Sequence, residues 1–312
     1  MGVTALASRL SLGEGSTPLV AAPRLSEALG LELHLKCDGL NPTGSFKDRG
    51  MVVAVERAAA AGAHSVVCAS TGNTAASASA YAARAGLRAV VLTPSGATAS
   101  AKRAQARAAG ACVLELRGTF DDALRLAREL GAREGFVLVN SLNPDRIAGQ
   151  KSVVHELVEQ LGSAPDIVVL PFGGGGNVTA VAAGLVELGA ATRIVVGQAA
   201  QRATTWASAI RIAQPAHGEH VAELVAAGRV EIVTLDEDEI RTWWRRLSTE
   251  EGAFCEPASA AGVAALAQLG VRGSLVAVAI LTGHGLKDTD AVEQAGGGSV
   301  DPSVDAILGE LG

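Results

Sequence analysis

The sequence has 312 residues, enough for about two domains of the usual size of roughly 150 residues. Hydrophobic residues make up 48% and charged residues 19%, which excludes an intrinsically disordered or collagen-like chain. There are 26 lysines and arginines against 32 aspartates and glutamates, a formal net charge of −6. We therefore expect no general nucleic-acid-binding surface and no surface for anionic membranes.

Four cysteines are scattered along the chain without a C-x-x-C pair: Cys37, Cys68, Cys112 and Cys255. This spacing is typical of a reduced, cytoplasmic protein and not of a disulfide scaffold or a zinc site. The first residues, MGVTALASRLS, lack the basic and then apolar regions of a secretory signal peptide. Residues 167–186 carry no charge, but Pro171 and four glycines divide them into strand, turn and helix. We expect a soluble protein.

Short β-branched segments alternate with segments of helical periodicity. We expect strands at residues 65–69, 88–92, 112–116, 136–140, 166–170, 193–198, 230–235 and 275–281. Segments rich in alanine and leucine, with helical spacing, follow each of the first five. This βαβ alternation predicts an α/β fold with doubly wound, largely parallel sheets that carry helices on both faces.

Small polar residues and glycines follow four of the predicted strands. They form the segments Ser70–Thr74, Ser141–Arg146, Gly173–Asn177 and Thr282–Gly285. Because ligands of parallel sheets bind beyond the carboxyl ends of the strands, we expect these segments to form one binding site. Small hydroxyl and amide side chains, with bare backbone amides, suit a small molecule that carries several negative charges.

The four glycines at 173–176 lie between a predicted strand and a predicted helix, where backbone amides can bind a phosphate. The run is no Rossmann G-x-G-x-x-G, because the sixth position from Gly173 is Val178 and from Gly174 is Thr179. It is no P-loop either, since no Gly-Lys-Ser/Thr follows at the required spacing. A flexible turn is the alternative, but four glycines there would cost conformational entropy for no gain. We favour phosphate binding.

Lys47 lies in GSFKDRG (44–50), just before a predicted helix that begins at Met51. A lysine with a lowered pKa can form a Schiff base with a carbonyl cofactor. A solvated surface lysine is the alternative. This segment alone does not decide between the two.

Six segments together resemble one enzyme family. They are LKCDGLNPTGSFKDRG, CASTGNTAASASAYAARAG, VNSLNPDRIAGQKS, PFGGGGN, FCEPASAAG and LTGHGLKD. Their order and spacing are similar to those of the threonine synthases, which are pyridoxal-phosphate (PLP) enzymes of the tryptophan-synthase-β fold, also called fold type II. The resemblance extends from residue 13 to residue 288 and implies a fold of two doubly wound parallel-sheet domains with the active site in the cleft between them.

The resemblance implies a role for each site residue. Lys47 corresponds to the Schiff-base lysine, which also transfers protons once it is freed. Asn73 corresponds to the residue that binds the phenolic oxygen of PLP, and Thr282 to the partner of the pyridine nitrogen. The phosphate cup of the cofactor corresponds to Gly173, Gly174, Gly175, Gly176 and Asn177. The residues that hold the substrate carboxylate correspond to Ser70, Thr71 and Thr74. Those that hold the phosphate of the substrate correspond to Asn140, Ser141 and Arg146.

The activity implied is a PLP-dependent carbon–oxygen lyase that converts O-phospho-L-homoserine and water to L-threonine and phosphate. The resemblance also implies a larger cofactor-binding domain (1–49 and 141–312), a smaller mobile substrate domain (50–140) and a cytoplasmic homodimer. No metal is expected: His217 and His220 are spaced like a metal-binding pair, but no third ligand follows at motif spacing. We expect these histidines to lie in a solvated turn.

One departure keeps alternatives open. The family's phosphate loop commonly reads GNAGN, whereas this chain reads GGGGN (173–177), so a side-chain contact at Gly174 is missing. A serine/threonine dehydratase explains the glycines but leaves Asn140, Ser141 and Arg146 without a function. A specialised enzyme for a phosphohomoserine analogue and a non-catalytic ligand-binding relative are further alternatives. An NAD-binding protein is disfavoured by the glycine spacing.

Overall fold

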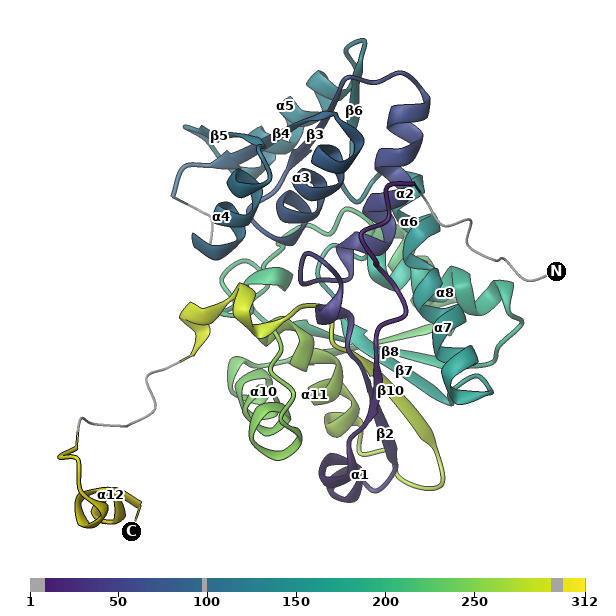
Figure 1. Cartoon of the computed structure of the whole chain (residues 1–312). Helices are drawn as coiled ribbons and strands as arrows, with labels where there is room; N and C mark the ends of the chain where they lie inside the picture. Colours follow the sequence, from purple (N-terminus) through teal and green to yellow (C-terminus); the bar gives the residue numbers. More distant parts are fainter. Residues whose placement is uncertain (1–8, 97–99, 293–299, 312) are drawn as a thin grey trace.

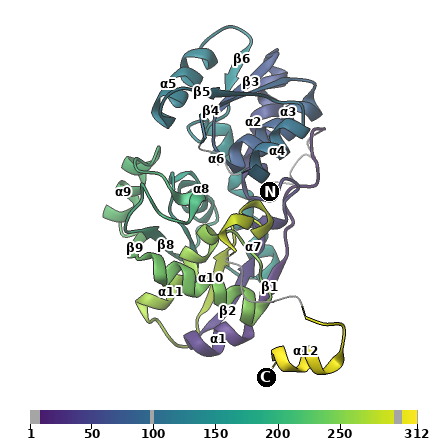
Figure 2. The same ribbon diagram turned by 90° about the vertical axis from the view of Figure 1, so that its left-hand side faces the viewer.

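The computed structural model describes residues 9–96, 100–292 and 300–311 and arranges ten strands of these residues in two sheets. Figures 1 and 2 show the sheets in two separate bodies. The larger sheet has the order β1-β2-β10-β7-β8-β9 and the smaller one β5-β4-β3-β6. Every pair of neighbours is parallel except β1 and β2. The predicted α/β fold with largely parallel sheets is confirmed.

The strands of the larger sheet are β1 (Leu19–Ala21), β2 (Glu32–Lys36), β7 (Ile167–Pro171), β8 (Arg193–Ala199), β9 (Val230–Leu235) and β10 (Val276–Ile280). Those of the smaller sheet are β3 (Ser65–Ala69), β4 (Arg88–Pro94), β5 (Cys112–Leu116) and β6 (Phe136–Leu138). The sequence analysis did not predict β1 and β2. It placed the end of β6 at Asn140, two residues too late, because the Asn140 side chain takes over the pairing with β3: its amide accepts from Ala69 N (2.9 Å) and donates to Ala69 O (2.8 Å).

Helices cover both faces of each sheet. The helices of the described residues are α1 (Pro23–Leu29), α2 (Lys47–Ala60), α3 (Asn73–Ala85), α4 (Ser100–Ala108), α5 (Phe120–Gly131), α6 (Pro144–Gln150), α7 (Ser152–Leu161), α8 (Gly176–Glu187), α9 (Gly218–Ala226), α10 (Glu237–Glu251), α11 (Ala260–Leu269) and α12 (Val304–Leu311). Buried alanine, valine and leucine side chains fill the space between sheets and helices. Capping boxes at Thr119 and Asp236, the residues directly before α5 and α10, fix the starts of these helices: each cap side chain accepts from a backbone N–H three residues later.

Two glycines bring α2 and α6 into backbone contact. A Cβ atom on Gly50 would lie 2.3 Å from the carbonyl oxygen of Arg146, and one on Gly149 would lie 2.2 Å from that of Arg49. No other residue type fits at either position without moving the helices apart. The close approach places Arg146 beside the helix that begins with Lys47.

The structure also bears on the remaining sequence expectations. No helix of the described residues is long and apolar enough to cross a membrane. The helix α12 lies apart from both sheets in Figures 1 and 2. The strands of the smaller sheet fall within residues 65–138, and the domain boundaries given above remain a prediction.

Candidate active site

The loop before Lys47 is fixed to the loop that follows β10. Phe46 N donates to Thr282 O at 3.0 Å, and Ser45 pairs with Gly283 in an isolated antiparallel bridge. Lys47 is the first residue of α2, four residues earlier than the helix start predicted from the sequence. Two predicted site residues, Lys47 and Thr282, are therefore brought together by backbone contacts.

Lys47 is held in an environment that favours its neutral form. Its Nζ atom lies 4.4 Å from the centre of the Phe46 ring. Burial, with a smaller contribution from the positive charge of Arg146, lowers the pKa of Lys47 to about 7, and the negative charge of Glu256 opposes the shift. Near neutral pH a substantial fraction of Lys47 is an unprotonated amine, the form that attacks a carbonyl group or accepts a proton.

The glycine loop (173–176) connects β7 to α8, and two buried polar atoms in the first turn of α8 have no partner among the described residues. Gly175 has a φ of +86°, a conformation that favours glycine, and α8 begins at Gly176. The side-chain Nδ2 of Asn177 and Oγ1 of Thr179 are buried and have no hydrogen-bond partner among the described residues. Buried polar atoms are normally paired, so these two atoms indicate a polar ligand beside the glycine loop.

Asn73 and Thr282 each follow the end of a strand and are buried. The Nδ2 of Asn73 donates to Glu256 Oε2 at 2.7 Å, and its Oδ1 is buried without a partner in the described part of the chain. The Thr282 hydroxyl lies 3.2 Å from the hydroxyl of Ser259. Both side chains retain hydrogen-bonding capacity for a ligand.

Glu256 is 1% exposed and links the two bodies of the protein. Its Oε1 atom lies 2.7 Å from the Nζ of Lys102, which belongs to α4 and is 3% exposed. A Cβ atom on Gly283 would lie 1.9 Å from Glu256 Oε2, so the carboxylate needs glycine at that position. The sequence analysis did not identify Glu256, Lys102 or Ser259, although FCEPASAAG, which contains Glu256 and Ser259, was one of the segments of the family resemblance.

Lys287 makes a second link across the same boundary. Its Nζ atom donates to Thr43 O and to Gln105 Oε1, each at 2.6 Å. Burial lowers the pKa of Lys287 to about 8. Since Gln105 is on α4 with Lys102, this helix is tied to the larger-sheet body at two points.

Arg146 is fully buried and only partly paired. Its Nη1 atom donates to Val139 O at 2.8 Å, whereas Nε and Nη2 have no partner among the residues that the structure describes. Burial lowers the pKa of Arg146 to about 10, with the charges of Cys68 and Asp48 acting in the opposite direction. At neutral pH it therefore remains a cation, and its two free donors suit an anionic ligand.

The other predicted substrate residues differ in how their polar groups are used. Ser70 Oγ accepts from the N–H groups of Gly72 (3.1 Å) and Ala75 (3.2 Å) at the start of α3. The Asn140 amide pairs with the backbone of Ala69, as described above. Thr71, Thr74 and Ser141 are partly buried. The substrate contacts of these five residues remain predictions.

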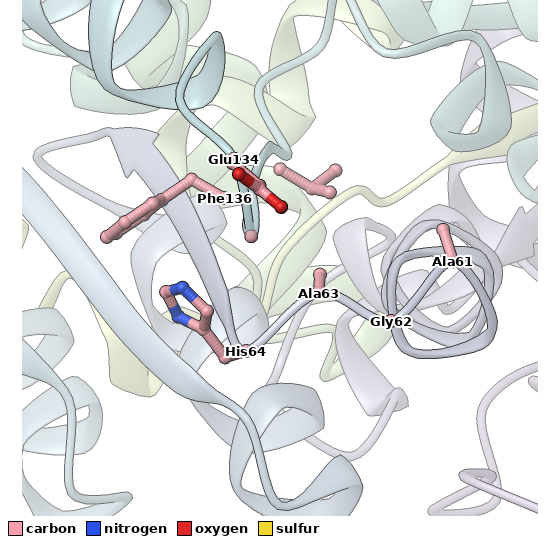
Figure 3. Close-up of a pocket in the computed structure, with 8 residues that line it drawn as sticks. Ala61, Gly62, Ala63, His64, Glu134 and Phe136 are labelled. Atoms are coloured by element: carbon pink, nitrogen blue, oxygen red, sulfur yellow. The ribbon is translucent and has the colours of Figure 1, made fainter.

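A separate hollow lies at the opposite end of the smaller sheet (Figure 3). It is lined by Ala61–His64 and Glu134–Val137, and the rings of His64 and Phe136 pack edge to face with their centres 4.9 Å apart. This is the amino end of β3 and β6, whereas the candidate site residues follow the carboxyl ends of the strands. The hollow is not part of the candidate active site.

A family profile described as "Pyridoxal-phosphate dependent enzyme" matches residues 10–283. The chain belongs to the pyridoxal-phosphate-dependent enzyme family. Curated relatives include the threonine synthase of Mycobacterium leprae, 45% identical over 90% of this chain and 84% of the relative. Another is the threonine synthase of Bacillus sp., 43% identical over 90% of this chain and 86% of the relative. The resemblance to threonine synthases is confirmed.

Solved structures agree on the fold. The crystal structure of O-ureido-L-serine synthase superposes with a TM-score of 0.82 at 24% identity, covering 97% of this chain and 98% of the other. The crystal structure of a threonine deaminase from T.th. superposes with a TM-score of 0.75 at 26% identity, covering 89% of this chain and 95% of the other. Fold type II and PLP as the cofactor are therefore confirmed for this pyridoxal-phosphate-dependent enzyme.

The residues present fit PLP. A phosphate group would meet the glycine loop and the unpaired polar atoms of Asn177 and Thr179. The carbonyl carbon of the cofactor requires an amine that is neutral near pH 7, which Lys47 provides. Among the described residues there is no group of His, Cys, Asp or Glu side chains that could hold a metal ion.

Proposed function

We propose that this enzyme is a carbon–oxygen lyase that converts O-phospho-L-homoserine and water to L-threonine and phosphate. The proposal rests on one observation: the buried cation Arg146 has two donors without partners among the described residues. The glycine loop accounts for the phosphate of PLP, so a second cationic site at a different strand end supports a second anion, carried by the substrate. The names of the curated relatives support the same activity.

We assign the parts of the cofactor to the predicted residues. Lys47 would hold the cofactor covalently, and the backbone of the glycine loop with Asn177 would bind its phosphate. Asn73, whose amide is oriented by Glu256, would bind the phenolic oxygen. The hydroxyl of Thr282, with Ser259 next to it, would bind the pyridine nitrogen.

When bound, PLP supplies an electron sink that makes the Cα–H bond of the substrate acidic. Lys47, neutral near pH 7, accepts the proton from Cα. Arg146 holds the phosphate of the substrate and stabilises the charge that grows on it as the Cγ–O bond breaks. A proton also leaves Cβ as the Cγ–O bond breaks; Cγ is then protonated and water adds at Cβ. Thr282 offers a neutral hydroxyl to the pyridine nitrogen, which moderates the sink and favours elimination over transamination.

The serine/threonine dehydratase alternative is favoured by the four glycines, and the solved structures include a threonine deaminase. This alternative gives the two free donors of Arg146 no anion to bind. An analogue of phosphohomoserine with a phosphonate in place of the phosphate would bind at the same site. Because it has a carbon–phosphorus bond where the substrate has the carbon–oxygen bond that breaks, it could not release phosphate.

The test is a comparison of substrates on one preparation of the PLP-loaded enzyme. O-Phospho-L-homoserine should yield inorganic phosphate and threonine in equal amounts. L-Serine and L-threonine should yield oxoacid and ammonia at a far lower rate. A deaminase rate that exceeds the rate of phosphate release would instead support the dehydratase.

The assembly and location of the enzyme belong to the same proposal. A cytoplasmic location is supported by its four cysteines, which are all described and free. A homodimer is supported by the exposed apolar side chains of Leu40, Phe254 and Leu286, which are 56%, 36% and 64% exposed. Leu286→Glu should shift the mass measured by light scattering from that of a dimer to that of a monomer. An unchanged dimer would place the interface elsewhere.

The mobile smaller domain (50–140) of the sequence analysis is also part of this proposal. Helix α4 is tied to the larger-sheet body by ion pairs and hydrogen bonds of buried side chains, which can form only when the two bodies are in contact. Such contacts support a domain that closes over the substrate and excludes water until it is needed.

A further inference from the structure

His217 packs against the glycine loop. It lies in the turn immediately before α9 and is partly buried, whereas His220 is exposed within α9, so the predicted solvated turn is correct only in part. Its backbone N–H donates to Gly174 O at 3.0 Å. A Cβ atom on Gly175 would lie 2.9 Å from the Cβ of His217, so the loop and the histidine are in direct contact.

The imidazole of His217 reaches a second loop. Its Nε2 atom lies 2.8 Å from the carbonyl oxygen of Ser141. Since a carbonyl oxygen can only accept, Nε2 carries the hydrogen of this bond. The side chain of Ser141 in turn lies against the glycine loop, with its Cβ atom 3.5 Å from the position of a Cβ on Gly176.

His217 therefore bonds to both phosphate-binding segments of the proposed function. Its backbone holds the loop assigned to the phosphate of PLP, and its side chain holds the segment that leads from β6 to Arg146. Two phosphates in one site repel each other, so the spacing of the two segments affects how well the second anion binds. A hydrogen bond between the segments fixes that spacing before the substrate arrives, which lowers the cost of ordering the site on binding.

We propose that His217 is a positioning residue that aligns the Ser141–Arg146 segment with the glycine loop and so determines the affinity of the enzyme for a substrate phosphate. This inference rests on the proposed function, because it takes the Arg146 site to bind the substrate. It assigns no proton transfer to the imidazole. The function required is one N–H donor at the position of Nε2.

Three variants of the PLP-loaded enzyme test the proposal. His217→Phe keeps a ring but removes the donor, and His217→Gln keeps an N–H near the position of Nε2. His220→Phe is the matched control, because His220 is exposed on α9, which begins directly after His217, and its ring bonds only to Glu223 among the bonds of the described residues. Each variant is assayed for the KM and kcat of O-phospho-L-homoserine, for PLP affinity and, by calorimetric titration, for the Kd of inorganic phosphate.

His217→Phe should raise both the KM and the phosphate Kd by roughly three- to tenfold, the range expected when one neutral hydrogen bond is lost. Its kcat and PLP affinity should stay within about twofold of wild type, a split that general damage to the loop would not produce. His217→Gln and His220→Phe should match wild type. The proposal is overturned if His217→Phe leaves KM and phosphate Kd unchanged, if it weakens PLP binding equally, or if His217→Gln fails as badly.

The phosphate titration separates this inference from the proposed function. A wild-type enzyme that releases no phosphate from O-phospho-L-homoserine refutes the proposed function. Phosphate binding that still weakens in His217→Phe would keep the alignment role for another phosphorylated substrate. Phosphate binding equal in wild type and His217→Phe refutes the alignment role whatever the activity.

Discussion

Arg146→Met should make the enzyme more stable and much less active. In the described structure the buried guanidinium has two donors without partners, and each buried unpaired group costs about 1–3 kcal/mol. The substitution also removes the bond to Val139 O, worth about 1.5–3 kcal/mol because the donor is charged. Replacing even a buried ion pair by apolar residues of similar volume is often neutral or adds about 1–4 kcal/mol of stability. We expect a net gain of about 1–3 kcal/mol in the free energy of unfolding.

The loss of activity follows from the same two donors. A hydrogen bond to a charged group contributes about 1.5–3 kcal/mol, and about 1.4 kcal/mol corresponds to a tenfold change in rate. The kcat/KM for O-phospho-L-homoserine should fall by roughly ten- to several hundredfold. The slow deamination of serine, which brings no phosphate, should change little.

Urea unfolding of the PLP-loaded proteins measures the stability difference, with and without inorganic phosphate. Phosphate at 100 times its Kd should stabilise wild type by about 2.7 kcal/mol and leave Arg146→Met unchanged. Arg84→Met, at an exposed arginine near the end of α3, should behave as wild type in both assays. A variant that is less stable than wild type by about 2 kcal/mol or more, or stabilised equally by phosphate, would refute an unpaired anion-binding arginine.

Four more substitutions test the rest of the site. Lys47→Ala should abolish the visible absorbance of bound PLP. In wild-type apoprotein, covalent capture of PLP should increase as the pH rises through about 7, because burial lowers the pKa of Lys47 to about 7. A midpoint near pH 10 would contradict this. Lys102→Met should cost about 3–5 kcal/mol by leaving the Glu256 carboxylate unpaired, and adding Glu256→Gln should recover part of that stability; strictly additive losses would exclude coupling. Thr282→Asp should favour a protonated pyridine nitrogen and change the ratio of products, so an unchanged ratio at the wild-type rate would remove Thr282 from the cofactor ring.

Local patterns in the sequence predicted the parts of the site that depend on local structure. The alternation of strands and helices places the loops after β3, β6, β7 and β10 at carboxyl ends of strands, and the structure joins these loops. The glycine loop was predictable because the residues that make it are consecutive. The start of α2 at Lys47 was not, since Ser45 and Phe46 are held by Gly283 and Thr282, over 200 residues away.

Contacts between distant segments were not predictable from the sequence. Asn73 and Glu256 are 183 positions apart, and His217 reaches Ser141 across 76 positions. The sequence positions of single buried charges do not reveal their partners, so the ion pair of Lys102 and Glu256 could be identified only from the structure. The short edge strand β1 has three residues and little alternation, too weak a pattern to detect.

Product analysis in water labelled with heavy oxygen tests the central claim most directly. In the proposed reaction the Cγ–O bond breaks and water adds at Cβ, so O-phospho-L-homoserine should give threonine with the label in its hydroxyl group and phosphate without the label. The two products should form in equal amounts. Labelled phosphate together with homoserine would show that the phosphorus–oxygen bond is hydrolysed, and oxoacid in place of threonine would show a dehydratase-type reaction; either result would contradict the account.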